Sequence, residues 1–74
     1  MESYIETQIE IELNGALHRV AQGHTLQDLV IALDLSGQAL AVAVNREIVQ
    51  RHGWPARRLQ AHDRVDVVRA IGGG

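Results

Sequence analysis

Apolar and polar residues alternate along residues 8–21 on both sides of an asparagine–glycine pair, Asn14-Gly15. Both central residues of a type I′ turn need a positive φ, so this pair between alternating runs predicts a β-hairpin. We interpret Asn14-Gly15 as turn chemistry and nothing more. A two-residue loop also fixes the register, so we expect three facing pairs on the buried side: Leu13 with Ala16, Ile11 with His18, and Ile9 with Val20.

Residues 25–37 carry the pattern of a short amphipathic helix. Thr25 is placed to cap its start, with Asp28 at the third position of a capping box. Four apolar residues then follow the spacing of one buried stripe: Leu26, Leu29, Val30 and Leu33. We expect roughly nine to ten helical residues. Gly37 suits a left-handed exit from this helix.

The second half of the chain predicts three more strands. Residues 39–44 form a strand with one bulky apolar face and one alanine face, and a turn leads from it to a short strand at 47–49. Residues 50–60 predict a loop with a helical turn, in which Trp54 and Leu59 plug the core. A fifth strand at 64–71 follows a turn at His62-Asp63.

The element order is strand, strand, helix, strand, strand, strand. A right-handed crossover keeps the helix on one face of the sheet. The order therefore predicts an α+β fold of the β-grasp (ubiquitin-like) type, in which a mixed five-stranded sheet wraps over one main helix. We expect one domain at 1–71, in which residues 1–7 are either a frayed leader or an extension of the first strand. Residues 72–74 then form a flexible glycine tail.

Composition excludes several kinds of chemistry. The 74 residues include no cysteine, which rules out thiol catalysis, cysteine-type zinc sites and sulfur held on a side chain. The four histidines lack metal-ligand spacing, and the hydroxyl residues form no nucleophile motif, so we expect neither a metal site nor an enzyme. No apolar run or signal sequence indicates a membrane. We therefore expect a soluble cytoplasmic protein that is a monomer on its own.

Charge is distributed unevenly along the chain. Residues 1–37 hold six acids against one arginine, whereas residues 38–74 hold six arginines against three acids. Such asymmetry favours an oriented encounter with a protein partner. The net charge of −2 is far from the strongly basic surface of a nucleic-acid-binding domain.

Three segments carry a resemblance to a known family. They are AVNREIV at 43–49, LQAHDRVDVVRAIGGG at 59–74, and the LNG hairpin followed by GHTLQDLV. Together they resemble ThiS, the family of sulfur carrier proteins of thiamin biosynthesis, over nearly the whole chain from about residue 9. Gln50-Arg51 stands where that family usually has Pro-Arg.

The resemblance implies a function for the terminal glycines. A partner enzyme of the adenylating, ubiquitin-activating type would use ATP with Mg to convert the Gly74 carboxylate to an acyl-adenylate. A persulfide donor would then supply sulfur, and the resulting thiocarboxylate would give that sulfur to thiazole synthase. Gly72 and Gly73 would be the tether, because glycine is narrow and takes backbone angles closed to other residues. No cofactor would be bound by the chain itself.

Strand alternation suggests where the partners dock. We expect a docking face on the outer side of the sheet, formed by Ala41, Ala43, Val68 and Ala70 with Arg69 and Arg46 nearby. Simple alanine filling of a strand is the other interpretation of these positions.

Two other functions fit a β-grasp domain with a glycine tail. The small subunit of molybdopterin synthase is similar in fold and tail, but it usually has a proline pair before its glycines, where this chain has Val68 to Ile71. A ubiquitin-like modifier or interaction module is the second. The absence of lysine argues against self-linked chains of such a modifier.

Overall fold

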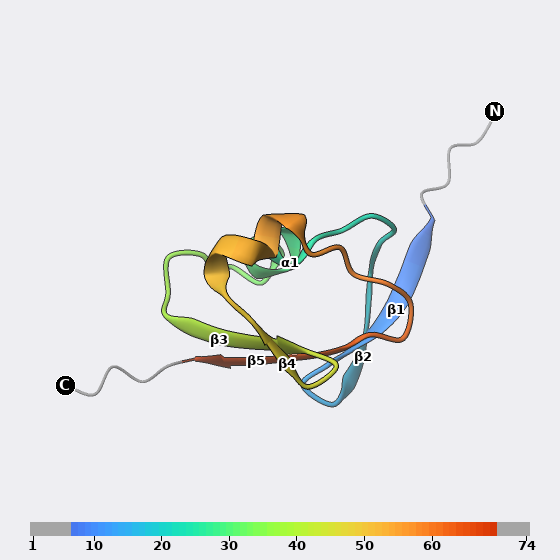
Figure 1. Ribbon diagram of the computed structural model, residues 1–74. Coiled ribbons are helices and arrows are strands. Elements are labelled where there is room, and N and C mark those ends of the chain that lie inside the picture. The colour runs from blue at the N-terminus through green and yellow to red at the C-terminus, as the bar shows by residue number, and fades with distance from the viewer. Residues whose placement is uncertain (1–6, 70–74) are drawn as a thin grey trace.

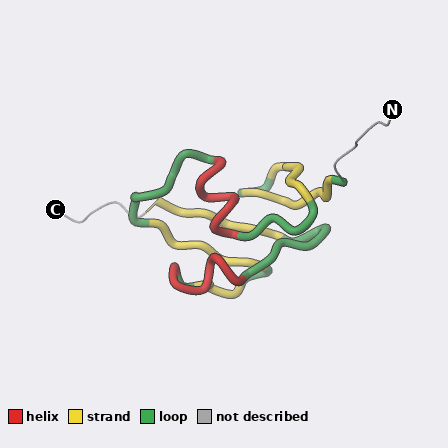
Figure 2. Tube along the Cα trace, turned by 90° about the horizontal axis from the view of Figure 1, so that it is seen from above, coloured by secondary structure: helices red, strands yellow, loops and turns green. Residues whose placement is uncertain are grey.

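The structure, a computed structural model, describes residues 7–69. The fold has two layers. The first is a β-sheet, and the second consists of helix α1 (Leu26–Ala32) and the 3-10 helix η1 (Arg51–Ala56), which cover one face of the sheet, as Figure 1 and the view from above in Figure 2 show. The strands are β1 (Gln8–Leu13), β2 (Ala16–Ala21), β3 (Leu40–Val44), β4 (Glu47–Val49) and β5 (Arg64–Arg69).

The sheet has the strand order β2-β1-β5-β3-β4. Its central pair, β1 and β5, is parallel, and the other pairs are antiparallel. This mixed five-stranded sheet with one main helix confirms the predicted β-grasp class. The last described strand, β5, therefore occupies the middle of the sheet.

The first hairpin has the predicted register. Ile9 faces Val20, Ile11 faces His18, and Leu13 faces Ala16. Asn14 and Gly15 have φ of 50° and 86°, as a type I′ turn requires. The ladder also reaches Thr7, whose carbonyl accepts a 2.9 Å hydrogen bond from the Gln22 N–H. Thr7 thus makes one backbone bond just before β1 begins at Gln8, and residues 1–6 of the expected leader lie outside the described residues.

Helix α1 begins as predicted and ends early. Thr25 and Asp28 form the capping box, with both N–H···O bonds at 3.1 Å. The helix has seven residues, fewer than expected, because Leu33 already serves as its C-cap. The left-handed residue after it is Asp34 (φ 61°), and not Gly37, which lies in a later turn. Hydrogen bonds from Asp34 to Ile31 and from Leu35 to Val30 complete a Schellman motif.

The capping box makes the stability of the fold depend on pH. The Thr25 backbone N–H donates to the Asp28 carboxylate and, with the Thr25 side chain, lowers the pKa of Asp28 below its ordinary value of 3.8. A lowered pKa in the folded state stabilises the protein above pH 3.8, and this stabilisation is lost as the pH falls through the lowered value.

We therefore expect Asp28→Asn to lower the free energy of unfolding at neutral pH and to have a shrinking effect below pH 3.8. Urea unfolding of the wild type and of Asp28→Asn between neutral and strongly acidic pH measures this difference. A difference that stays constant over that range would contradict the prediction.

The core lies between the sheet and the two helices. Its fully buried side chains are Ile11, Leu26, Leu29, Val30, Val42, Val44, Trp54 and Val65. Trp54 comes from η1, and its indole N–H donates a 2.8 Å bond to the Val49 carbonyl. Trp54 and Leu59 thus plug the core as predicted, in a segment where the expected helical turn is η1. Strand β3 begins at Leu40, one residue later than predicted.

Candidate functional site

Strand β5 leads the chain toward the predicted site. It runs between β1 and β3 and ends at Arg69, at the opposite end of the molecule from the start of β1 (Figure 1). The reacting residue Gly74, the tether residues Gly72 and Gly73, and Ala70 of the docking face lie outside the described residues, as does the 71/72 domain boundary. Their roles stay predictions, and the described site is the surface from which the tail departs.

Part of the predicted docking face is assembled by strand pairing. Ala41 faces Val68 between β3 and β5, and Ala43 is the next outward residue of β3. Val68 is 60% exposed, and Ala41 is exposed beside it. These residues lie on the side of the sheet away from α1, because their neighbours Val42 and Val67 face the core.

Ile48 is a member of this face that the sequence analysis missed. It pairs with Ala43 across the β3–β4 hairpin and is 70% exposed. The Asn45-Arg46 turn, with both φ positive at 52° and 73°, fixes that register. A two-residue turn at Asn45-Arg46, like the one at Asn14-Gly15, places Ile48 opposite Ala43. We call Ala41, Ala43, Ile48 and Val68 the outer patch.

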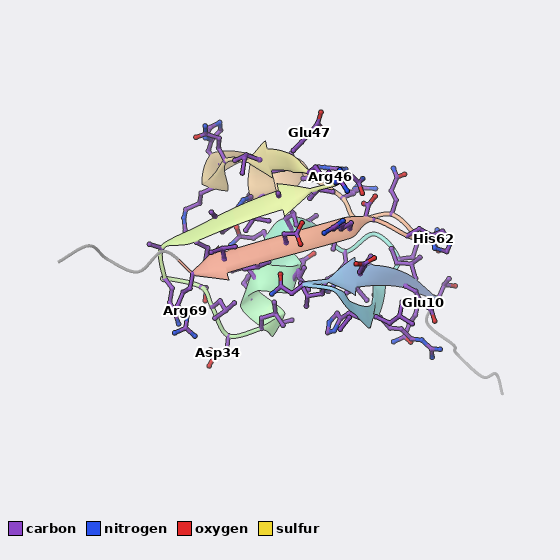
Figure 3. The ribbon with its side chains drawn as sticks, turned by 90° about the horizontal axis from the view of Figure 1, so that it is seen from below. Glu10, Asp34, Arg46, Glu47, His62 and Arg69 are labelled. Carbon is purple, nitrogen blue, oxygen red and sulfur yellow. The ribbon has the colours of Figure 1, made fainter. Side chains whose placement is uncertain are left out.

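The two arginines expected beside the face are not brought together. Arg69 pairs with Leu40 at the end of β5. Because side chains alternate along a strand, Arg69 lies on the same face of the sheet as Val65 and Val67, the face toward the helices. Arg46 lies in the β3–β4 turn at the other end of β3, as Figure 3 shows. The outer patch therefore has one arginine beyond each of its ends. Arg69 belongs to the opposite face of the sheet, the one that α1 covers.

The β1–β2 half of the outer face carries charged residues and one exposed apolar side chain, Leu17, which is opposite Glu12. Glu10 and Arg19 form an ion pair of 3.3 Å across β1 and β2, and Arg64 and Asp66 form one of 3.6 Å along β5. Asp66 lies next to the outer patch, opposite Ala43. The outer patch thus lies on the β5-β3-β4 half of the sheet, the half that also holds the end of β5, whereas Leu17 is separate from it on the edge strand β2.

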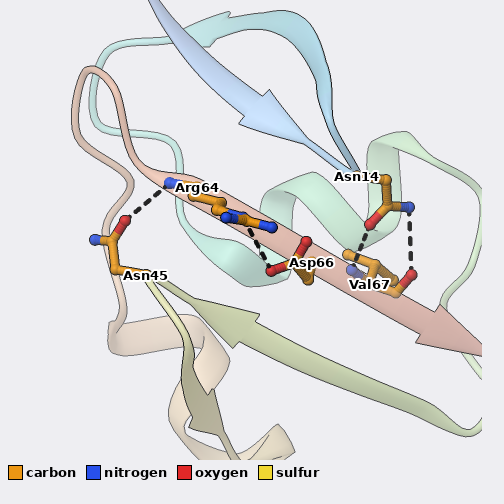
Figure 4. A network of polar contacts seen from close by, with 5 residues as sticks. All are labelled: Asn14, Asn45, Arg64, Asp66 and Val67. Carbon is orange, nitrogen blue, oxygen red and sulfur yellow. Dashed lines mark hydrogen bonds and ion pairs between the residues drawn. The ribbon is translucent and has the colours of Figure 1, made fainter.

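Two asparagine side chains hold β5 from opposite sides (Figure 4). The Asn14 side-chain oxygen accepts a 2.8 Å bond from the Val67 N–H, and its NH₂ donates to the Val67 carbonyl at 3.3 Å. The Asn45 oxygen accepts a 2.9 Å bond from the Arg64 N–H. The interpretation of Asn14 as turn chemistry alone was therefore wrong. Its amide also joins the hairpin to a strand 53 residues away.

Asp63 explains how the start of β5 is fixed. It is the buried polar residue of the described chain, 8% exposed, and its two oxygens accept bonds from the Gln60 N–H at 2.8 Å and the Asn45 NH₂ at 3.0 Å. Its carboxylate thus ties the turn before β5 to the β3–β4 turn.

Metal sites and pockets are the other kinds of site to consider within residues 7–69. Over this range no group of three or more histidine, aspartate or glutamate side chains is placed to hold a metal, and no pocket is found. No helix within the described part of the chain is long and apolar enough to cross a membrane.

Comparison with known families decides among the candidate functions. The ThiS family model matches residues 5–74. The chain belongs to the ThiS family. The match includes the glycine run and begins before Ile9, so part of the segment expected to be a leader falls within the family's span. As a ThiS protein, the chain is a small sulfur carrier of thiamin biosynthesis and is not itself a catalyst.

Individual ThiS relatives agree with this assignment. The sulfur carrier protein ThiS of Escherichia coli is 30% identical over 66 residues, covering 89% of this chain and 100% of that protein. The crystal structure of the thiamine biosynthesis protein ThiS from Geobacter metallireducens matches with a TM-score of 0.77 and 25% identity, over 89% of this chain and 100% of that one.

A third relative is larger. A thiazole synthase of Magnetococcus marinus is 38% identical over 66 residues, which cover 89% of this ThiS chain and 20% of the synthase. The chain thus spans about a fifth of that protein. That thiazole synthase therefore contains a segment that is similar to this ThiS chain.

Proposed function

We propose that this ThiS chain carries sulfur as a thiocarboxylate on Gly74 and delivers it to a thiazole synthase. The observation that carries the proposal is the family match, which runs through the glycines to residue 74. The absence of cysteine supports it, because no side-chain thiol is available to hold the sulfur. The ThiS-like segment in a thiazole synthase supports the choice of acceptor.

The chemistry follows from the fact that a carboxylate is a poor acceptor for sulfur until a good leaving group is attached to it. The Gly74 carboxylate oxygen attacks the α-phosphorus of ATP in an activating enzyme, and pyrophosphate leaves. The terminal sulfur of a persulfide donor then attacks the acyl carbon, and AMP leaves. A thiol cleaves the resulting acyl disulfide and releases the thiocarboxylate. The chain supplies the reacting group, and ATP with its Mg is bound by the partner.

The body must bind the partner while the tail is ordered. Residues 70–74 follow the end of β5, and ordering five residues costs roughly 5–10 kcal/mol. At about 25 cal/mol per Å², contact over about 200–400 Å² of apolar surface offsets this cost. The outer patch lies on the half of the sheet that contains β5, so we propose it as the docking face for the activating enzyme.

Intact mass spectrometry tests the function. The chain is incubated with ATP, Mg, its activating enzyme, a persulfide donor and a thiol, and a parallel sample omits ATP. We expect one oxygen to be replaced by one sulfur only when ATP is present. Trypsin cleaves after arginine, so cleavage after Arg69 releases residues 70–74 and should release all of the added sulfur with them. Sulfur in any other peptide, or an unchanged mass, would contradict the proposal.

Val68→Asp tests the docking face. A carboxylate placed at the centre of an apolar contact loses its hydration without gaining a partner. We expect the dissociation constant for the activating enzyme to rise at least about tenfold, equivalent to about 1.4 kcal/mol. Isothermal titration calorimetry measures it. Ile48→Asp should act similarly.

Ile31→Asp is the matched control for this substitution. Ile31 is 54% exposed, but it lies on α1, in the other layer of the molecule. We expect it to leave the dissociation constant unchanged. An equal effect of Val68→Asp and Ile31→Asp would place the docking face elsewhere.

A further inference from the structure

The two edges of strand β5 are paired with neighbouring strands over different lengths. On one side, β3 pairs with it as far as Leu40 opposite Arg69. On the other side, β1 pairs with it only at Glu12–Arg64 and Leu13–Val65 before the chain turns away. The last backbone bond on this side runs from the Asn14 N–H to the Val65 carbonyl, at 2.9 Å.

The Asn14 side chain continues the parallel ladder beyond the end of β1. Its amide accepts from the N–H and donates to the C=O of Val67, as the backbone of a neighbouring strand residue would do. Among the described contacts it is the last one made to β5 from this side. Without it, both polar groups of Val67 on this side lose their partner, and the end of β5 is held by β3 alone.

We propose that Asn14 is a positioning residue for the tail, because it fixes the point from which the last five residues must reach the partner's nucleotide site. This inference rests on the proposed role of Gly74. Five residues extend at most about 17 Å, so the terminal carboxylate has a limited range. Each residue released from β5 also has to be ordered again when the tail is inserted. Displacement of a reacting group by about 1 Å can cost a factor of about 10² in rate.

Asn45 provides a matched comparison within the same chain. Like Asn14, it is the first residue of a two-residue turn, with φ of 52° against 50°. It also accepts a bond from a β5 N–H, at 2.9 Å, but at Arg64, where the strand begins. Its loss should loosen the start of β5 and leave the end of the strand in place.

The test compares Asn14→Gly with Asn45→Gly in the full chain. Glycine adopts the positive φ of either turn, so each variant keeps its hairpin and loses its amide contacts with β5, and Asn45→Gly also loses the donor to the Asp63 carboxylate. Amide hydrogen exchange should become faster at Val67 in Asn14→Gly and at Arg64 in Asn45→Gly. Unfolding in urea measures the stability that each variant loses.

The functional readout is pyrophosphate release during adenylation by the activating enzyme. For Asn14→Gly we expect kcat to fall about tenfold, since the tail is mispositioned. KM should change less than about twofold, since the outer patch is intact. Asn45→Gly should change both by less than about twofold. Asn14→Asp, which still accepts the Val67 N–H but has no donor for the carbonyl, should restore part of kcat.

Two results would overturn the inference. Equal kcat losses in the two glycine variants would show that both clamps act only through stability. An unchanged kcat in Asn14→Gly would show that the end of β5 needs no second neighbour. A wild-type chain that the enzyme never adenylates would overturn the proposed function and the inference together, so failure of the inference alone is recognised by normal adenylation of the wild type.

Discussion

Deletion of Gly73 and Gly74 is expected to abolish thiocarboxylate formation. The shortened chain still ends in a glycine carboxylate, so the reacting group itself is chemically unchanged. Its position is what differs, because two extended residues span about 7 Å. A shift of this size exceeds what an adenylating site tolerates, and we expect a rate loss of more than about 10²-fold. The body should remain folded, since its last described strand ends at Arg69.

The measurements are intact mass after incubation with the activating enzyme, and growth of a strain lacking its own carrier on medium without thiamin. A matched deletion of Glu2 and Ser3 removes two residues that precede the family match at residue 5. That variant should acquire sulfur and support growth like the wild type. Sulfur on the chain that lacks Gly73 and Gly74 would show that the terminal glycine is not the carrier.

Trp54→Ala is expected to have the largest effect on stability. Trp54 is 1% exposed and fills the space between η1 and the sheet, and its indole N–H satisfies the Val49 carbonyl. Removing the ring should lower the free energy of unfolding by about 3–5 kcal/mol. Domains of this size have a total stability near the lower end of about 5–15 kcal/mol. The variant should therefore be largely unfolded or close to it at room temperature.

Urea unfolding followed by far-ultraviolet circular dichroism measures this loss without using the tryptophan signal. Arg51→Ala is the control, because the Arg51 guanidinium lies 4.6 Å from the centre of the Trp54 ring and contributes a surface cation–π contact and an exposed hydrogen bond to the Gln38 carbonyl, which water can replace. It should cost less than about 1 kcal/mol. A Trp54→Ala loss below about 1.5 kcal/mol would mean that the core closes over the missing ring.

Local patterns predicted most of the fold because each depends on residues close in sequence. Asn14-Gly15 fixed six pairs of β1 and β2, since a two-residue turn leaves one register. The helix was harder. Leu33 has the spacing of a buried helical residue, but a left-handed Asp34 follows it and ends the helix. The spacing of apolar residues predicts which side chains face the core, but it does not predict the residue at which the helix ends.

The features missed at the site depend on contacts between distant segments. The bonds from the Asn14 amide to Val67 require β5 to continue past the end of β1, which no local pattern shows. The separation of Arg46 from Arg69 likewise follows from the antiparallel pairing of β3 with β5. Ile48 is different, since the Asn45-Arg46 turn predicts its place opposite Ala43. The tail itself lies outside the described residues, so its role depends on family membership and chemistry.

The central position of β5 also governs when the chain acquires its shape during synthesis. The parallel partners Glu12 and Arg64 are 52 residues apart, and β1 and β3 meet only through the strand between them. Long-range pairing of this kind forms late, after the intervening segment has been made. The sheet stays in two separate parts until β5 is available to pair with both of them. A folded body is therefore itself a sign that translation has passed Arg69, and chains abandoned earlier are left open to proteolysis.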